Sequence, residues 1–221
     1  MDTAMMTNDN IEKARFNMVE QQIRTWDVLD EKILNIVRTI HREEFVPESF
    51  ESLAFADLCI PLAHEQEMFT PKLEARILQT LNIQPSDSVL EVGTGAGYLT
   101  ACLSKLAAKV HSIDYYADFI NDTKVRLENF STLNVTLEQK DFYELLKLPQ
   151  TFDVIVLSGS IPIYDERIPK LLAPGGRLFV VVGIEALLIE RIDETHWKQT
   201  SLFETQLLPL INAKPQQQFQ F

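Results

Sequence analysis

The stretch "VLEVGTGAGYLT" runs from Val89 to Thr100 and changes character twice along its length. It opens with four apolar or acidic residues, continues with glycine at every second position (Gly93, Gly95 and Gly97), and ends where a helical pattern begins. These are three of only 7 glycines in the chain, and glycine lets the backbone turn sharply or approach a ligand closely. The stretch therefore predicts a ligand-binding loop between a strand and a helix.

On either side of this loop the sequence alternates between strand-like and helical patterns. The expected strands are "DSVLEVG", "KVHSID", "VTLEQKD", "FDVIVLSG" and "RLFVVVG", and the expected helices are "GYLTACLSKLA", "ADFINDTKVRLENF" and "YDERIPKLLA". Such alternation predicts an α/β fold: a mostly parallel sheet with helices on both faces. After Gly183, "ALLIERID", "HWKQTSLFE" and "QLLPLI" follow without helices between them, so we expect antiparallel strands at the C-terminal end.

The N-terminal third has a helical pattern. We expect residues 11–45 to be helical, with Asp27 or Asp30 as a cap, and a second helix to run from Pro71 to Leu81. Thr70 is its expected N-cap, because a proline at the first helical position follows it. The expected organisation is a single domain: N-terminal helices and a loop over residues 1–80, a ligand-binding core over 81–213, and a tail over 214–221.

Composition and charge restrict the partners. The chain has 20 Lys and Arg residues against 32 Asp and Glu residues, a net charge of -12. Because Lys and Arg supply the affinity for nucleic acid and for anionic membranes, we expect neither partner. We also expect no membrane span and no secretory signal, hence a cytoplasmic protein. Cys59 and Cys102 lie far apart without C-x-x-C spacing, so no disulfide or metal site is predicted. The oligomeric state stays open.

The spacing of the glycines indicates the kind of ligand. Dinucleotide-binding loops read G-x-G-x-x-G, and the position that would complete this pattern holds Tyr98. Here Glu91 precedes the glycines, and Asp114 ends the next expected strand, where a carboxylate can accept both ribose hydroxyls. The loop has no basic residue for a pyrophosphate. The pattern therefore favours a nucleoside with an attached amino acid, as in S-adenosylmethionine.

Asp141 and Phe142 follow the third expected strand of the core. We predict that Asp141 accepts a hydrogen bond from the adenine amino group and that Phe142 lies against the ring. The alternatives are that Asp141 is an ordinary residue at a strand end, and that the glycines only allow tight packing of helix on strand. The predicted cofactor contacts are Glu91, Gly93, Thr94, Gly95, Gly97, Asp114, Tyr115, Asp141 and Phe142.

Longer segments carry a resemblance to a known family. These are "LEVGTGAGYLTA", "REEFVP", "IPLAHEQEMFTPKLEARIL", "FDVIVLSGSIPIYDERIPKLLAPGGRLFVVVG" and "LLPLI". On them the chain resembles the protein-L-isoaspartate O-methyltransferases nearly end to end. The resemblance implies a Rossmann-like methyltransferase core with extra N-terminal helices. It implies methyl transfer from S-adenosylmethionine to the α-carboxylate of isoaspartyl residues in a damaged protein or peptide. Glu91, Gly93, Gly95, Asp114 and Asp141 carry over as cofactor contacts.

The chemistry implied by the resemblance needs no general base. A carboxylate is already ionised at pH 7, and a sulfonium is a good leaving group. Alignment and desolvation of the acceptor can then supply most of the catalysis. The sequence accordingly shows no convincing Cys–His or Ser–His–Asp constellation.

The chain departs from this family in one loop. Members read G-Q-T-I-S-Q-P, with the serine beside the acceptor carboxylate, whereas this chain has Glu65 to Pro71, "EQEMFTP", with Phe69 at the serine position. Candidate acceptor-site residues are Thr70, His64 and Gln66, with Ser158 and Ser160 as further sources of a hydroxyl. The alternatives are that Thr70 only caps a helix and that His64 is a solvent-exposed residue. A different acceptor, or cofactor binding without turnover, also stays open.

Overall fold

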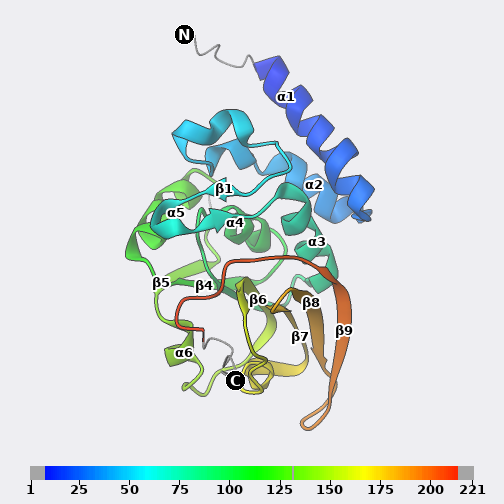
Figure 1. The fold of residues 1–221 in the computed structure, drawn as a ribbon, viewed down its shortest axis with the longest axis vertical. Helices are drawn as coiled ribbons and strands as arrows, with labels where there is room; N and C mark the ends of the chain where they lie inside the picture. The colour runs from blue at the N-terminus through cyan, green and yellow to red at the C-terminus, as the bar shows by residue number, and fades with distance from the viewer. Residues whose placement is uncertain (1–7, 131, 214–221) are drawn as a thin grey trace, which may run out of the picture. The chain divides into compact units, whose positions relative to one another are not determined.

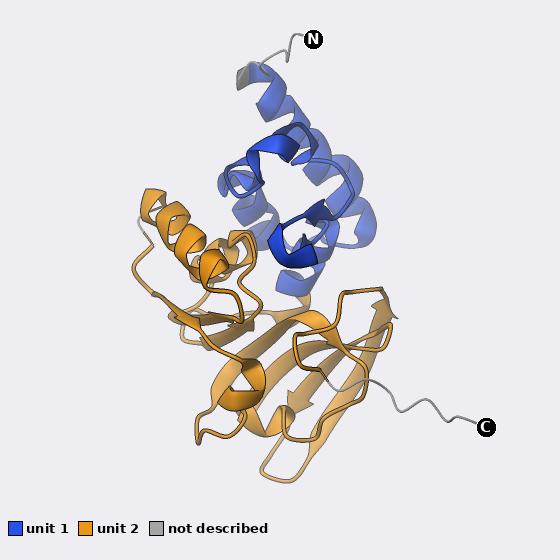
Figure 2. Ribbon diagram, turned by 60° about the vertical axis from the view of Figure 1, so that its left-hand side comes forward, with its two compact units in different colours: residues 1–79 blue, residues 80–221 orange. Residues whose placement is uncertain are grey.

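The computed structural model describes residues 8–130 and 132–213. The chain divides into two compact units, residues 1–79 and 80–221, which Figure 2 colours separately. The expected division into N-terminal part, core and tail stays a prediction, and the tail over 214–221 lies outside the described residues.

Unit 1 is helical and contains one small hairpin. Its α-helices are α1 (Asn8–Asn17), α2 (Glu31–Thr39) and α3 (Pro71–Leu81), the last of which continues into unit 2. Shorter helical segments are η1 (Met18–Ile23, a π-helix), η2 (Arg24–Trp26), η3 (Arg42–Glu44), η4 (Glu48–Leu53) and η5 (Ala63–Glu65). Strands β1 (Ile60–Pro61) and β2 (Glu67–Met68) pair antiparallel.

The expectation of one helix over residues 11–45 is wrong, because the chain leaves the helical conformation before α2. Asp27 has a left-handed backbone (φ 58°), which a short polar side chain tolerates. α2 then starts anew, with the Asp30 carboxylate accepting a hydrogen bond of 2.8 Å from Lys32 N. Asp30, not Asp27, is therefore the N-cap.

Unit 2 contains a seven-stranded sheet in the order β5-β4-β3-β6-β7-β8-β9 (Figure 1). The strands are β3 (Ser88–Val92), β4 (Lys109–Asp114), β5 (Val135–Gln139), β6 (Phe152–Ile161), β7 (Leu172–Val182), β8 (Glu185–Arg191) and β9 (Trp197–Glu204). β5, β4, β3, β6 and β7 run parallel, and β8 and β9 complete the sheet antiparallel. The predicted Rossmann-like α/β fold with antiparallel C-terminal strands is confirmed.

Helices connect the parallel strands and cover the sheet. α4 (Tyr98–Ser104) packs on β4, and α5 (Ala117–Asn129) packs on β4 and β5. The interior is built from apolar residues of the central strands and their connections. Its buried members include Leu90, Ile113, Phe142, Leu145, Ile155, Leu157, Leu178, Val180 and Ile189.

Two expected elements of unit 2 are wrong, and a proline explains each. "YDERIPKLLA" forms only the 3-10 turn η6 (Pro169–Leu171), because Pro169 lacks the N–H that an α-helix needs at that position. "QLLPLI" makes an isolated bridge between Ser160 and Pro209 instead of a strand. The unexpected α6 (Phe142–Leu145) is a single helical turn.

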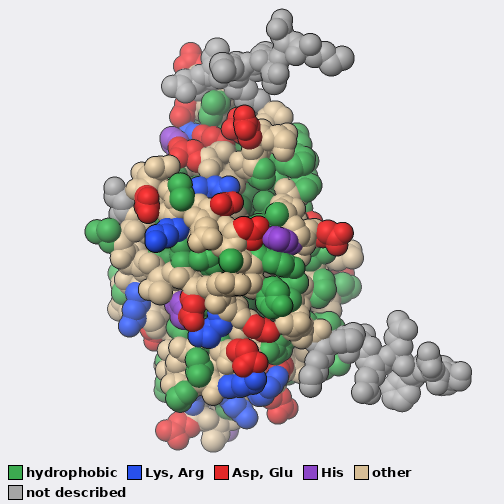
Figure 3. Space-filling model, turned by 90° about the vertical axis from the view of Figure 1, so that its left-hand side faces the viewer, with side chains coloured by type: hydrophobic (Ala, Val, Ile, Leu, Met, Phe, Trp, Pro, Cys, Tyr) green, Lys and Arg blue, Asp and Glu red, His purple; other side chains and the backbone are tan. Residues whose placement is uncertain are grey.

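In the part of the chain that the structure describes, no helix has the length and apolar character that a bilayer span requires. The same residues contain no group of three or more His, Cys, Asp or Glu side chains placed to hold a metal ion. On the face that Figure 3 shows, acidic, basic and apolar side chains are interspersed. The expectation that nucleic acid and membranes are not partners stays a prediction.

Candidate functional site

The glycine loop leaves β3 in a left-handed conformation. Gly93, Gly95 and Gly97 all have positive φ, at 96°, 49° and 88°. Gly93 N donates a hydrogen bond of 2.8 Å to Ile113 O on β4, and Gly97 N donates one of 2.9 Å to Thr94 O. Because residues with a Cβ rarely adopt this backbone, the loop conformation depends on glycine.

Glu91 lies under this loop and is fully buried. Its carboxylate accepts hydrogen bonds from Thr100 Oγ1 at 2.5 Å and from Ser112 Oγ at 2.6 Å. Ser112 Oγ is also 2.6 Å from Thr94 Oγ1, so one buried network joins β3, the loop, α4 and β4. This burial makes Glu91 and Thr94 supports of the loop. The sequence prediction of a direct cofactor contact for either residue stays a prediction.

Asp114 ends β4 beside the loop, as predicted from the topology, and only 7% of it is exposed. Its Oδ2 accepts a hydrogen bond of 2.9 Å from Gly95 N, and its Oδ1 accepts one of 2.9 Å from Tyr116 N. Burial raises the pKa of Asp114, although these backbone donors act in the opposite direction. The next residue, Tyr115, is 45% exposed, and its ring packs edge-on against Tyr116.

Two residues of α5 that the sequence pattern does not indicate hold the other side of the loop. Thr123 Oγ1 donates to Gly95 O at 3.3 Å, and Arg126 Nη1 donates to Ala96 O at 3.1 Å. A Cβ at Gly97 would lie 2.6 Å from two side-chain atoms of Thr123. The helical pattern alone gives no sign of these contacts, because they depend on how α5 packs against the loop.

The loop and Asp114 fit the chemistry of a nucleoside-bearing cofactor. Asp114 presents a carboxylate, an acceptor for ribose hydroxyls, at the carboxyl edge of a parallel sheet, where α/β folds bind their ligands. Gly93 is tightly placed: a Cβ built on it would lie 3.1 Å from the Cβ of Ser158. A side chain at Gly93 would therefore press on Ser158 of β6.

The two residues predicted to contact adenine, Asp141 and Phe142, both take part in the fold of unit 2. The Asp141 carboxylate caps α6 by accepting from Tyr143 N at 2.8 Å and accepts from Asn212 Nδ2 at 2.7 Å. Phe142 is 4% exposed and belongs to the hydrophobic core of unit 2. The predicted position of the Phe142 ring against a ligand stays a prediction. The predicted adenine contact of Asp141 stays a prediction.

At the carboxyl end of β6, the two candidate serines differ. Ser160 Oγ donates a hydrogen bond of 2.9 Å to Leu207 O and is buried, so its hydroxyl is committed to the fold. Ser158 lies beside Gly93. The structure thus removes Ser160 from the candidate sources of a hydroxyl for the acceptor.

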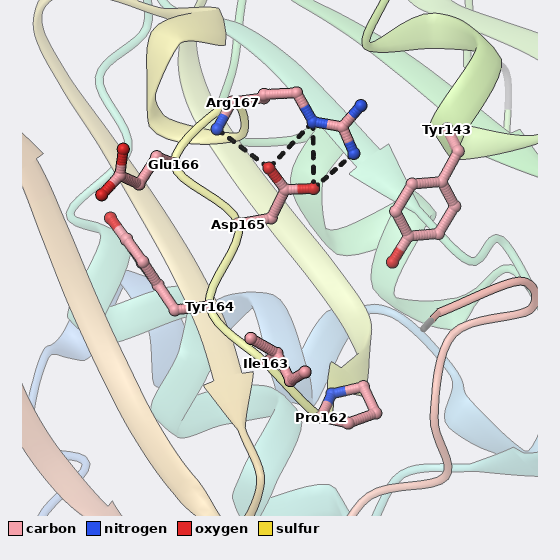
Figure 4. A pocket seen from close by; sticks show the side chains of 7 residues that line it. All are labelled: Tyr143, Pro162, Ile163, Tyr164, Asp165, Glu166 and Arg167. Carbon is pink, nitrogen blue, oxygen red and sulfur yellow. Dashed lines mark hydrogen bonds and ion pairs between the residues drawn. The ribbon is translucent and has the colours of Figure 1, made fainter. Parts of the chain in front are cut away.

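A cavity of about 300 Å³, which no sequence motif indicates, follows directly after β6. Figure 4 shows the Arg167 guanidinium bound to the Asp165 carboxylate on one side and the Tyr143 ring facing that pair. Burial raises the pKa of both Tyr143 and Tyr164. The lining residues are Tyr143, Pro162, Ile163, Tyr164, Asp165, Glu166 and Arg167.

In unit 1, the predicted acceptor loop is the turn of the β1–β2 hairpin. His64 and Glu65 both have left-handed backbones, with φ of 57° and 56°. Gln66 N donates to Ala63 O at 3.1 Å, which closes the turn, and the Gln66 side chain donates to His64 O at 3.1 Å. Two consecutive positive φ values are characteristic of a type I′ hairpin turn, which normally contains glycine or asparagine.

Arg42 holds the end of this loop from inside unit 1. The Arg42 side chain is 1% exposed, forms an ion pair with Glu74, and donates to Ala54 O at 2.9 Å and to Phe69 O at 2.5 Å. Burial raises the pKa of Glu74 to about 7, although Arg42 lowers it. The family segment "REEFVP" therefore contributes the residue that fixes the backbone of Phe69.

Phe69 itself is buried at 7% exposure, as expected for a pocket wall or a core residue. Thr70 Oγ1 lies 3.4 Å from Leu73 N, and Thr70 O accepts from both Leu73 N and Glu74 N. Thr70 therefore stands at the N-terminus of α3, where the sequence places a cap. Its hydroxyl, His64 and Gln66 belong to unit 1, whereas the cofactor candidates belong to unit 2.

The family model of protein-L-isoaspartate(D-aspartate) O-methyltransferase (PCMT) matches residues 13–214. A protein-L-isoaspartate O-methyltransferase of Koribacter versatilis is 34% identical over 209 residues, with 93% of each chain covered. That of Rhodopseudomonas palustris is 32% identical over 206 residues, covering 91% of this chain and 94% of its own.

Solved structures agree in fold. A candidate β-aspartate methyltransferase from Plasmodium falciparum, crystallised with S-adenosyl-L-homocysteine, superposes with a TM-score of 0.76 at 19% identity. The match covers 90% of this chain and 97% of the other. A second structure, a protein-L-isoaspartate O-methyltransferase, gives a TM-score of 0.74 at 23% identity over 90% of this chain and 65% of its own.

Proposed function

The chain belongs to the protein-L-isoaspartate O-methyltransferase family, and we propose that it methylates the free α-carboxylate of isoaspartyl residues in damaged proteins. The family uses S-adenosylmethionine as the methyl donor. The observation that carries the proposal is the bond between the Asp114 carboxylate and Gly95 N, which joins the tip of β4 to the glycine loop. A ribose-binding carboxylate beside a glycine loop without basic residues is the arrangement such a donor requires.

The residues of unit 2 hold and orient the donor. When bound, S-adenosylmethionine supplies an electrophilic methyl group on a sulfonium. Asp114 would accept hydrogen bonds from the ribose, and Tyr115 offers an exposed ring next to it. Glu91 accepts hydrogen bonds from Thr100 and Ser112 beneath the loop and so supports its conformation.

The acceptor needs alignment rather than activation. An isoaspartyl α-carboxylate is ionised at pH 7, so no general base has to remove a proton before attack. The protein therefore contributes by holding the carboxylate in line with the methyl group and by excluding water. The methyl ester formed on the isoaspartyl residue then favours succinimide formation and partial return to aspartate.

We assign the acceptor loop to residues 64–70. His64 and Glu65 are exposed at the tip of the hairpin, and Gln66 is half-buried behind them, so His64 and Gln66 are the proposed contacts to the peptide. For Thr70, the bond to Leu73 N supports the role of helix cap over that of a hydroxyl donor. A cytoplasmic protein substrate is the proposed partner.

The direct test is methyl transfer from labelled S-adenosylmethionine to an isoaspartyl peptide. We expect base-labile methyl incorporation into the isoaspartyl peptide and none into the same peptide with an ordinary aspartyl residue. Equal, background-level incorporation into the two peptides would reject the proposed acceptor while leaving the fold unaffected.

A second candidate function is methyl transfer to a different carboxylate, and Phe69 favours it. A buried phenyl ring stands where the family resemblance places a serine, and it cannot donate a hydrogen bond. Activity on small carboxylic acids but not on isoaspartyl peptide would select this alternative. S-adenosylhomocysteine binding without turnover of any acceptor would indicate a cofactor-binding protein instead.

A further inference from the structure

Ser158 carries a buried hydroxyl that the fold does not use. Among the described residues, Ser158 Oγ has no hydrogen-bond partner, although the atom is shielded from solvent. A buried hydroxyl without a partner costs free energy, so natural proteins keep one where a ligand or a water completes it. The position of Ser158 indicates which part of the protein such a ligand would contact.

Ser158 stands at the carboxyl end of β6, directly beside the first glycine of the loop. Its Cβ lies 3.1 Å from the position that a Cβ on Gly93 would occupy, and its carbonyl oxygen lies 3.8 Å from the same position. In parallel α/β sheets the carboxyl ends of neighbouring strands surround the ligand. Ser158 therefore faces the same edge of the sheet as the glycine loop.

An irregularity in β6 gives Ser158 this position. β6 pairs with β7 through Val156 and Phe179 and next through Ser160 and Val181. Three residues of β6 (157, 158 and 159) thus lie opposite one residue of β7, which disrupts the regular alternation of side chains. Such bulges are common next to active sites, because they redirect a side chain.

The two residues after Ser158 are used by the fold itself. A Cβ on Gly159 would come within 2.8 Å of Leu210, so the C-terminal segment packs tightly there. Ser160 Oγ donates to Leu207 O in the same segment. Ser158 is thus the serine of "SGS" whose hydroxyl has no hydrogen-bond partner among the described residues.

We propose that Ser158 donates a hydrogen bond to the acceptor carboxylate and holds it beside Gly93 during methyl transfer. This inference rests on the proposed function and names a residue for it. A carboxylate only accepts hydrogen bonds, and a hydroxyl can donate one without adding a charge that would neutralise the nucleophile. A neutral donor at this position orients the acceptor and preserves its reactivity.

The experiment compares Ser158→Ala with Ser160→Ala in the full-length protein. We expect Ser158→Ala to reduce kcat/KM for the isoaspartyl peptide by about 10-fold or more, the scale of one hydrogen bond to a charged group. Its Tm should stay equal to the wild-type value or rise, because the change removes an unsatisfied hydroxyl. Ser160→Ala should lower the Tm, because Leu207 O loses its donor, and should change kcat/KM by no more than about twofold.

Two further measurements locate the hydroxyl contact. Calorimetry with S-adenosylhomocysteine should give the same Kd for Ser158→Ala and wild type. Isoaspartyl peptide should bind the S-adenosylhomocysteine complex more weakly in the variant. A loss of cofactor affinity that accounts for the whole loss of activity would overturn the acceptor assignment, as would kcat/KM within about twofold of wild type.

Failure of the proposed function has a different signature. Wild-type protein without turnover of the isoaspartyl peptide would reject that function. Peptide binding to the S-adenosylhomocysteine complex would then decide the role of Ser158. Weaker binding by Ser158→Ala than by wild type would support that role, and equal or absent binding would overturn it.

Discussion

Asp114 and Gly95 are joined by a hydrogen bond of 2.9 Å from the Gly95 backbone N to Asp114 Oδ2. The bond connects the end of β4 to the middle of the glycine loop, although 19 residues separate the two in sequence. One carboxylate thereby fixes the loop, and the same carboxylate is the proposed acceptor for the ribose hydroxyls. The bond makes Asp114 the residue whose replacement most directly tests the cofactor site.

Replacing Asp114 with alanine should weaken S-adenosylhomocysteine binding. A hydrogen bond to a charged group contributes about 1.5–3 kcal/mol, so the Kd should rise about 10- to 100-fold. Asp114→Asn, which keeps an acceptor oxygen but loses the charge, should fall between alanine and wild type. Titration calorimetry measures the Kd of S-adenosylhomocysteine for wild type and for both variants.

Asp122→Ala is the matched control for this experiment, because Asp122 is an exposed carboxylate on α5. This variant should leave the Kd of S-adenosylhomocysteine unchanged. That result would show that the loss of one negative charge does not by itself weaken binding. An Asp114→Ala protein that is folded and binds S-adenosylhomocysteine as tightly as wild type would remove the ribose role from Asp114.

Replacing Gly97 with alanine should damage the loop through packing as well as through backbone strain. Gly97 has φ of 88°, and the new Cβ would lie 2.6 Å from Thr123. Gly175→Ala is the control, because its φ of 78° is similar while nothing lies within 4 Å of its Cβ position. Urea denaturation should show about 1–2 kcal/mol lost for Gly175→Ala, the cost of a left-handed backbone.

We expect Gly97→Ala to lose at least about 1 kcal/mol more free energy of unfolding than Gly175→Ala. It should also bind S-adenosylhomocysteine more weakly. The double variant Gly97→Ala with Thr123→Ala should recover part of the excess. Equal losses of stability for the two glycine variants would show that Thr123 does not limit the size of residue 97.

The fold could be predicted from sequence wherever a segment has a single strong pattern. The continuous apolar runs of β3, β6 and β7 predict buried strands. Asp114 falls at the end of its strand whichever register that strand takes. Pro169 and Pro209 mark the two failures in unit 2. In both segments the apolar spacing indicated an element, and the missing proline N–H prevented it from forming.

Of the candidate site, only the glycine loop and the carboxylate at the end of β4 were predictable from sequence. Glycine spacing and strand ends identify Gly93, Gly95 and Asp114 without any knowledge of packing. The support of Glu91 by Thr100 and Ser112 depends on three elements meeting, and hydroxyl residues of this kind give no pattern in sequence. Ser158 and Ser160 would share a face in a regular strand, so only the bulge in β6 distinguishes them.

Stability should depend on pH through Glu74. Burial raises its pKa to about 7 from an ordinary 4.5, so the folded protein retains a proton at pH values where the unfolded chain has lost it. This contribution is fully present below the unfolded pKa and is lost as the pH rises through about 7. It amounts to roughly 3 kcal/mol.

Urea denaturation between pH 5 and pH 8 measures this effect. The free energy of unfolding should decrease with pH in wild type and decrease less in Glu74→Gln, which cannot ionise. Arg38→Gln is a control on a more exposed ion-pairing residue and should keep the wild-type slope. Parallel curves for wild type and Glu74→Gln would show that Glu74 does not change protonation in this range.

Replacing Glu65 with glycine should stabilise the hairpin and favour an anionic acceptor. Glu65 has φ of 56° at the exposed tip of the turn, a conformation that costs a residue with a Cβ about 1–2 kcal/mol and costs glycine little. Allowing for the greater entropy of glycine in the unfolded chain, Glu65→Gly should raise the free energy of unfolding by about 0.5–1 kcal/mol. Urea denaturation provides this value.

Glu65→Gln distinguishes the effect of the charge from the effect of backbone strain, since it keeps the Cβ and removes the carboxylate. Both variants should lower KM for the isoaspartyl peptide about two- to threefold at low salt, with the difference from wild type shrinking as salt screens the charge. Only Glu65→Gly should also gain stability. A KM that stays at the wild-type value in both variants at low salt would show that the charge at the tip of this turn does not oppose the acceptor.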